Sequence, residues 1–409
     1  MNDERRRAAI RVIESLEKEG FEAYLVGGCV RDYVLKKTPQ DYDVATSARP
    51  EQVEAIFAHT VPTGIKHGTV TVLQDQTSVE VTTFRIESDY QDHRRPGRVK
   101  FVSSLKQDLA RRDFTINAMA QDRHGRIYDY FSGIEDLNDK KVRTVGNPVE
   151  RFHEDPLRMV RAARFVAQFD FELDKQTELA LLKCKQQCVY LSVERVTAEL
   201  EKMWKARRAS KGIGILFTCG LIYSLPPFNN WKIQDVPGPD QLAPMDWTDD
   251  RIIRWAYLLF CCGVSSDNAQ SRLREFRLSN TDIAAITSCF RLGAEWKSLT
   301  ETTAKRLLLT EGLTNVLKAS GLAKLLRRLP ADVFLDKQLQ KWWDEMPVTQ
   351  VRELDISGKE LVEHCQQPAG PWVKKTLAYL LEKVALGQLP NQKNVLLKEG
   401  CYFGANHSQ

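Results

Sequence analysis

The pattern of apolar and polar residues predicts a mixed α/β region at the start of the chain. Residues 4–19 carry apolar side chains at helical spacing, which predicts an amphipathic packing helix. The apolar run 23–26 predicts a short strand that ends at two glycines and leads into a second helix. β-Branched residues dominate 68–73 and 79–85, which predicts two further strands.

Beyond about residue 147 the pattern becomes helical. Residues 147–169 predict one helix, with Pro156 tolerated as in a first turn, and 192–208 predict another that starts at a serine cap. The proline-rich stretch 223–249 predicts a long connection. Further helices are predicted at 251–262, 269–276, 283–296, 304–308 and 372–386. The predicted fold class is α+β, with a mixed-sheet domain followed by helical domains.

One polar segment interrupts the first region. Residues 86–98 contain Pro96 and Gly97 and are predicted to lack regular structure. A mobile loop is the simplest interpretation. Its mixed acidic and basic residues could instead take part in the chemistry of a neighbouring site.

Composition sets the class of protein. The 409 residues suggest two to four domains, and 43% hydrophobic with 28% charged residues is typical of a globular protein. No apolar run approaches the ~20 residues of a membrane span, and the N-terminus does not resemble a signal peptide, so we expect a cytoplasmic protein with no membrane partner. The net charge of +5 is small, so a nucleic-acid partner would be bound by local basic patches.

Nine cysteines are scattered without a C-x-x-C pair. Cys184 and Cys188 have the i, i+4 spacing of one helix face. We therefore expect reduced thiols in the core, with neither a disulfide framework nor a zinc site.

Candidate chemistry begins at the two glycines. Gly28 lets the backbone approach a ligand, a helix starting there points N–H groups at a phosphate, and Arg31 adds further donors. A tight turn without a ligand is the common alternative. If the segment of Asp41 and Asp43 is a strand, both carboxylates lie on one face and could bind Mg²⁺ together with substrate phosphates. A solvated strand edge is the alternative for that pair.

The order of these motifs resembles a known family. Gly-Gly, Arg-Asp and Asp-x-Asp together are similar to the nucleotidyltransferase superfamily related to DNA polymerase β, and LVGGCVRD…DYDVAT resembles the class II tRNA nucleotidyltransferases and bacterial poly(A) polymerases. The resemblance implies a polymerase-β-like head with Mg²⁺ as cofactor on the catalytic residues Asp41 and Asp43. It also implies a triphosphate at Gly28 and Arg31. Glu80 could be a third metal-site carboxylate or an exposed strand residue.

Two later motifs extend the resemblance to nucleotide binding. RRDFTINAMA is similar to the family's second motif, which implies that Arg112 faces the triphosphate. EDPLRMVRAARF resembles the nucleotide-selecting motif Glu-Asp-x-x-Arg-x-x-Arg. This match implies that the base and sugar are held by Asp155, Arg158, Arg161 and Arg164. A solvated basic helix face is the alternative.

The selecting pair also has a chemical logic. Cytosine and adenine both present an amino donor beside a ring-nitrogen acceptor, whereas uracil and guanine present a carbonyl beside an N–H. Asp155 as acceptor and Arg158 as donor therefore suit C and A and leave unpaired groups against U and G. Glu194 and Arg195, in a following motif, are expected to brace the selecting helix.

The resemblance implies template-independent addition of C, C and A to the 3′ end of tRNA from CTP and ATP, with release of pyrophosphate. A partial CC-adding or A-adding enzyme, a poly(A) polymerase and, less favoured, a non-enzymatic RNA-binding scaffold are the alternatives. A homodimer is possible. The expected domains are a catalytic head at 1–146, a selecting neck at 147–222, a helical body at 223–350 and a tRNA-binding tail at 351–409.

Overall fold

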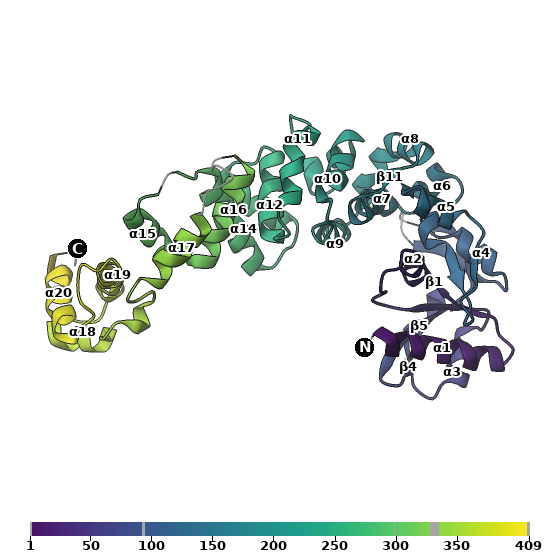
Figure 1. Ribbon diagram of the computed structural model, residues 1–409, viewed down its shortest axis with the longest axis horizontal. Helices are drawn as coiled ribbons and strands as arrows, with labels where there is room; N and C mark the ends of the chain where they lie inside the picture. Colours follow the sequence, from purple (N-terminus) through teal and green to yellow (C-terminus); the bar gives the residue numbers. More distant parts are fainter. Residues whose placement is uncertain (1, 92–94, 298, 328–334, 407–409) are drawn as a thin grey trace. The chain divides into compact units, whose positions relative to one another are not determined.

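The computed structural model describes residues 2–91, 95–297, 299–327 and 335–406 (Figure 1). The chain forms two compact units, Met1–Asp246 and Trp247–Gln409. The first unit contains the sheet and the helices around it, and the second has only helices as regular secondary structure among its described residues. The predicted fold class, a mixed-sheet head followed by helices, is confirmed.

A seven-stranded sheet forms the centre of the head, in the order β3-β4-β5-β2-β1-β8-β9. It is mixed, because β2 and β5 run parallel whereas the other neighbours are antiparallel. The strands are β1 (Ala23–Val26), β2 (Asp43–Thr46), β3 (Thr60–Gly64), β4 (Thr69–Gln74), β5 (Thr77–Thr83), β8 (Met119–Gln121) and β9 (Ile127–Asp129). The helix α1 (Asn2–Lys18) packs on β1, β4 and β5, and its apolar face is fully buried there.

The register of the central strands places one acidic residue beside the glycine turn. Asp43, the first residue of β2, pairs with Val26, the last residue of β1 before the turn. On its other side Asp43 pairs with Glu80 of β5. Helix α2 (Gly28–Val34) follows β1 directly, so the turn, Asp43 and Glu80 meet at one end of the sheet.

The prediction that 86–98 lacks regular structure is wrong for its described residues. Strands β6 (Arg85–Gln91) and β7 (Arg95–Phe101) form a separate antiparallel hairpin, and residues 92–94 lie outside the described part of the chain. Pro96 lies in β7 opposite Tyr90. A two-stranded ribbon has only edge strands, and an edge strand accepts a proline because one side of it needs no ladder hydrogen bond.

The prediction of one helix over 147–169 is also corrected. The chain forms α6 (Pro148–Glu154) and α7 (Leu157–Phe169), with Asp155 extended between them at φ −147° and ψ 101°. A residue before proline is pushed out of the helical region, so Pro156 breaks the helix at Asp155. Other helices in this unit are α3 (Pro50–Ile56), α4 (Leu105–Ala110), α5 (Gly133–Asn138), α8 (Lys175–Cys184), α9 (Val193–Met203), α10 (Ala209–Thr218) and α11 (Pro239–Leu242). The short parallel strands β10 (Lys141–Val142) and β11 (Glu172–Leu173) link the region before α6 to the chain after α7.

The second unit contains nine α-helices among its described residues. They are α12 (Arg251–Cys261), α13 (Ser266–Glu275), α14 (Asn280–Ala294), α15 (Glu301–Glu311), α16 (Leu313–Leu325), α17 (Leu335–Asp344), α18 (Gly358–Cys365), α19 (Pro371–Ala385) and α20 (Lys393–Asn406). Within the described residues, no helix is both long and apolar enough to cross a membrane.

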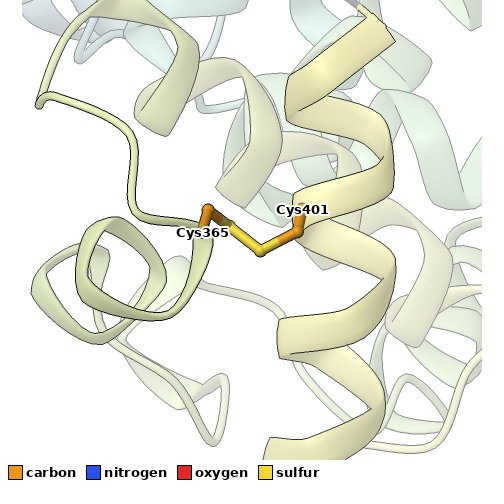
Figure 2. Close-up of a disulfide and its surroundings, with 2 residues drawn as sticks. All are labelled: Cys365 and Cys401. Atoms are coloured by element: carbon orange, nitrogen blue, oxygen red, sulfur yellow. A yellow bond between two sulfur atoms is a disulfide. The ribbon is translucent and has the colours of Figure 1, made fainter.

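The expectation that all cysteines are reduced is wrong at one pair. Cys365, at the end of α18, and Cys401, in α20, form a disulfide with their Cα atoms 5.3 Å apart (Figure 2). The two residues are 36 positions apart, so their pairing depends on how α18 and α20 pack and is not visible in the spacing. The other seven cysteines are free and buried, as expected.

Candidate active site

A cavity of about 690 Å³ in the first unit brings the predicted site residues together. Its walls include the nine residues expected to bind metal or nucleotide: Gly28, Arg31, Asp41, Asp43, Arg112, Asp155, Arg158, Arg161 and Arg164. They come from α2, the start of β2 and the residues just before it, the segment after α4, the link between α6 and α7, and α7 itself. The two parts of the sequence with candidate chemistry therefore line one cavity.

The glycine turn forms one end of this cavity. Gly27 has φ +74°, and a Cβ atom added there would lie 3.0 Å from Nη1 of Arg112. Position 27 therefore requires glycine, both for its backbone conformation and for the close approach of Arg112. Gly28 is the first residue of α2. The more demanding position is therefore Gly27, which also lines the cavity.

Arg31 is held rigidly although its side chain lines the cavity. It is 7% exposed, donates from Nη1 to Oδ1 of Asn117 at 2.6 Å, and donates from Nε to Asp32 at 2.9 Å. Its guanidinium carbon lies 4.7 Å from the ring centroid of Phe169. These contacts fix a positive charge beside the turn, which suits an anionic ligand.

The two aspartates differ in their surroundings. Asp41 precedes β2, so the predicted strand does not include it, and its carboxylate is 87% exposed with Arg5 at 3.6 Å. The Asp43 side chain is reached by solvent, yet desolvation by the surrounding protein, then repulsion from Glu80, raise its pKa to about 6. Asp41 adds to this rise and Arg112 opposes it.

The carboxylates fit a cation that the substrate helps to hold. The described residues contain no group of three or more His, Cys, Asp or Glu side chains positioned to bind a metal. Magnesium commonly takes only one or two carboxylates and completes its shell with phosphates and water. Burial is the main cause of the raised pKa of Asp43, and repulsion from Glu80 and Asp41 adds to it; a dication would relieve that repulsion.

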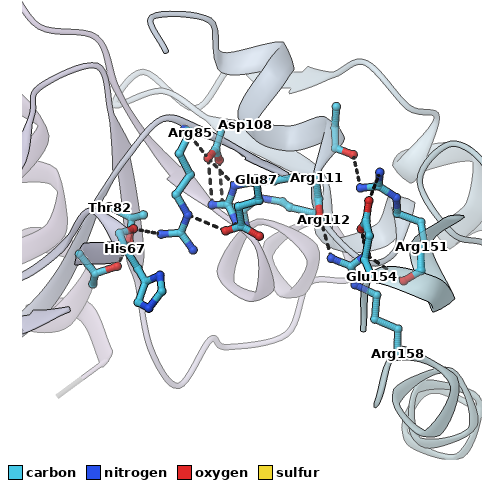
Figure 3. A network of polar contacts seen from close by, with 12 residues as sticks. His67, Thr82, Arg85, Glu87, Asp108, Arg111, Arg112, Arg151, Glu154 and Arg158 are labelled. Carbon is cyan, nitrogen blue, oxygen red and sulfur yellow. Dashed lines mark hydrogen bonds and ion pairs between the residues drawn. The ribbon is translucent and has the colours of Figure 1, made fainter. Parts of the chain in front are cut away.

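Arg112 lies at the end of a polar network that reaches the hairpin (Figure 3). Its Nη2 donates to the buried Asp108 at 3.4 Å, and its buried Nε has no partner among the described residues. Asp108 also accepts from Arg111, whose Nη1 donates to Glu87 of β6 at 3.1 Å. Arg85, at the base of the same strand, donates to Glu87 at 2.6 Å.

The predicted selecting pair lies on one wall, and each member has its own support. Asp155 accepts from Arg195 of α9 at 2.7 Å, which confirms the expected bracing by Arg195. Arg158 forms an ion pair with Glu154 and donates from Nη2 to the backbone carbonyl of Arg111 at 3.2 Å. Both side chains are therefore fixed by protein contacts outside the pair itself.

The next two arginines of α7 are paired with buried acids. Arg161 donates to Asp113 at 2.8 and 2.5 Å, and Arg164 donates to Glu199 at 2.5 Å. Burial acts to raise the pKa of Asp113, but the charge and hydrogen bonds of Arg161, with the Asn117 amide, lower it to about 2. Burial likewise opposes ionisation of Glu199, and the charge of Arg164 holds its pKa below the usual range.

The residues missed by sequence reasoning are the partners that hold the predicted ones. Asp113, Asn117 and Lys202 line the cavity, and Glu199 lies directly behind it. Asp113 and Asn117 belong to the RRDFTINAMA motif, and Glu199 lies in the helix after Ser192. The sequence signal existed, but helical spacing cannot say which acid pairs with which arginine.

Comparisons with known proteins give a consistent picture. Family models match residues 23–143 (poly A polymerase head domain), 170–231 (RNA- and SrmB-binding site of polymerase A) and 248–399 (tRNA nucleotidyltransferase domain 2). The CCA-adding enzyme of Bacillus velezensis is 39% identical over 94% of this chain and 95% of its own length. That of Listeria monocytogenes serotype 4a is 39% identical over 94% of each chain.

Solved structures agree in fold. The CCA-adding enzyme of Bacillus stearothermophilus, in complex with CTP, superposes with a TM-score of 0.83 at 33% identity and 98% coverage of both chains. The Thermotoga maritima CCA-adding enzyme complexed with tRNA has a TM-score of 0.65 at 20% identity, covering 97% of this chain and 94% of its own. At that identity the likeness supports the fold alone.

Proposed function

The chain belongs to the family of CCA-adding enzymes, and we propose that it builds and repairs the 3′-terminal CCA of tRNA from CTP and ATP with release of pyrophosphate. The observation that carries this proposal is the single cavity that joins Asp41 and Asp43 to Asp155 and Arg158. Relatives with the same printed function are 39% identical over nearly the whole chain.

Asp41 and Asp43 are proposed to hold magnesium at the catalytic end of the cavity. Bound Mg²⁺ supplies charge stabilisation for phosphoryl transfer and activates the primer 3′-OH. The chain's own part is to keep Asp43 ionised when the cation is present and to hold the triphosphate with Arg31 and Arg112. Glu80 is proposed as a third carboxylate, because it pairs with Asp43 across the sheet and raises the pKa of Asp43.

Base selection is proposed to rest on Asp155 and Arg158 as a fixed template. Arg195 fixes the carboxylate of Asp155, and Glu154 with the Arg111 carbonyl fixes the guanidinium of Arg158. Side chains held this way cannot rearrange, without losing these contacts, to pair with uracil or guanine. Those bases present an acceptor and a donor where cytosine and adenine present a donor and an acceptor. Unpaired polar groups in a closed site are costly, so this arrangement favours C and A. Arg161 and Arg164 are proposed to hold the nucleotide's base and sugar.

The β6/β7 hairpin is proposed to let one site pass C twice and then A. Its base is tied through Glu87 to Arg111, and the Arg111 carbonyl accepts from Arg158. Movement of the hairpin can therefore change the position of Arg158 through these contacts. This is a gating role. We propose that shortening the segment 86–98 leaves CC addition largely intact and selectively reduces addition of the terminal A.

The remaining assignments follow the family. We propose a catalytic head at 1–146, a selecting neck at 147–222, a body at 223–350 and a tRNA-binding tail at 351–409. The proposed cofactor is Mg²⁺, the proposed place of action is the cytoplasm, and a homodimer is the oligomer to test first. Match of the first domain to a poly A polymerase head keeps poly(A) synthesis as the second candidate function.

One experiment tests the activity directly. The purified protein is incubated with tRNA lacking CCA, with each nucleotide separately and with CTP and ATP together, and products are resolved at single-nucleotide length. We expect CC with CTP alone and CCA with both. Products that stop at CC, or long A tracts with ATP, would identify the partial enzyme or the poly(A) polymerase. Asp41→Ala and Asp43→Ala serve as controls, expected to lose addition while tRNA affinity changes only a few-fold.

A further inference from the structure

A second cavity, of about 570 Å³, opens on the same two carboxylates. The linings of the two cavities share seven residues: Gly28, Arg31, Asp41, Asp43, Arg164, Gln168 and Lys202. The second cavity's own wall comes from the segment between α2 and β2, which supplies Lys37, and from the chain after α9, which supplies Lys205. This space is separate from the wall formed by Asp155 and Arg158, which line only the first cavity.

The two cavities differ in how their cations are neutralised. Arg161 of the first cavity and Arg164, which lines both, are paired with Asp113 and Glu199. In the second, neither Lys37 nor Lys205 forms an ion pair with any described residue. Two exposed ammonium groups thus line a space whose acids are the proposed metal ligands and Asp32, which is paired with Arg31. Such a space attracts an anion.

The aromatic residue in this cavity is already engaged. Phe169 lies with its ring centroid 4.7 Å from the Arg31 guanidinium carbon and 5.4 Å from Nζ of Lys37. The ring also stacks on Phe165, with centroids 5.9 Å apart and planes 10° apart. Its faces therefore orient cations and pack on a neighbour, which leaves no free platform for a nucleobase. The expected ligand is a phosphate group without a stacked base.

We propose that the second cavity binds a phosphoanion through Lys37 and Lys205. The anion reaches it either as the pyrophosphate end of the incoming nucleotide or as a backbone phosphate of the primer strand. Arg31 favours the first source, because it lines both cavities and lies beside the glycine turn. This inference rests on the proposed function, since it assigns the second cavity to the same reaction.

The test compares two double variants of equal charge. Lys37→Gln with Lys205→Gln removes both cavity cations. Lys36→Gln with Arg207→Gln removes two exposed neighbouring cations that line neither cavity. Binding of inorganic pyrophosphate is measured by titration calorimetry, KM is measured for CTP and ATP, and affinity for tRNA lacking CCA is measured against salt concentration.

For the leaving-group source, the cavity variant should bind pyrophosphate roughly three- to tenfold more weakly and show a similar rise in nucleotide KM. For the primer source, tRNA affinity should fall instead, with the slope of log K against log salt reduced by about one per lost phosphate contact. A cavity variant that matches the neighbouring control in all three measurements overturns the proposal. If the wild-type protein fails to extend tRNA, the proposed function is wrong. The pyrophosphate titration still tests whether the second cavity binds a phosphoanion.

Discussion

Replacing Gly27 by Ala should damage the active site more than the fold. The residue has φ +74° and ψ −128°, a conformation that L side chains rarely adopt. Holding alanine there costs roughly 1–3 kcal/mol, which is a substantial part of a typical stability of about 5–15 kcal/mol but not all of it. The variant should therefore fold with a lower free energy of unfolding.

The second effect falls on Arg112. The new Cβ would lie 3.0 Å from its Nη1, closer than an ordinary contact, so the guanidinium must move by a few tenths of an ångström. A charge-assisted hydrogen bond from this arginine to a phosphate is worth about 1.5–3 kcal/mol. Losing much of it slows nucleotide addition roughly ten- to hundredfold.

Gly125→Ala is the matched control. Gly125 has φ +89°, and nothing lies within 4 Å of an added Cβ, so this variant carries backbone strain alone. Urea denaturation measures stability, and initial rates with CTP and ATP measure activity. Both variants should lose stability, whereas only Gly27→Ala should lose activity. Full activity in Gly27→Ala at its reduced stability would refute a role for Arg112 in holding the triphosphate.

Further predictions concern the carboxylates, the template and the tail. The raised pKa of Asp43, about 6, predicts that the rate of nucleotide addition at limiting Mg²⁺ increases as the pH rises through about 6, because the protonated carboxyl cannot bind a cation. A flat pH–rate profile from pH 5 to 8 would contradict this. The folded state holds this proton more tightly than the unfolded state, so the contribution of Asp43 to the free energy of unfolding should decrease as the pH rises from about 4 to about 6. In denaturation curves, Asp43→Asn should abolish this decrease. Asp155→Ala with Arg158→Ala should raise the share of UTP and GTP incorporated more than it raises nucleotide KM, as measured in four-nucleotide competition; an unchanged preference would place base choice elsewhere. Arg195→Ala should shift the same preference in the same direction by a smaller factor, because it frees Asp155 without removing it. Replacing Cys401 by Ser removes the disulfide between α18 and α20, whose cysteines are 36 positions apart. The variant should lower the stability of the second unit by up to about 3–4 kcal/mol while nucleotide addition is unchanged. Equal melting curves for the variant and the wild type would show that the bond adds no stability.

The sequence alone determined which chemical groups line the candidate site and much of the secondary structure. Gly28, Arg31, Asp41 and Asp43 stand within sixteen residues, so their meeting depends only on a strand, a turn and a short helix. The arginines of α7 recur at helical spacing for the same local reason. Signals of this kind are readable because backbone geometry fixes which nearby residues share a face.

Tertiary structure decided what holds those groups in place. Arg161 pairs with Asp113, 48 residues away, and Arg195 reaches back 40 residues to Asp155. The hairpin at 85–101 and the disulfide between α18 and α20 likewise depend on partners that no local pattern specifies. Periodicity reports which side of an element is buried, but it cannot report which other element covers that side. The pairing of charges and thiols therefore emerges only when the helices and strands are packed together.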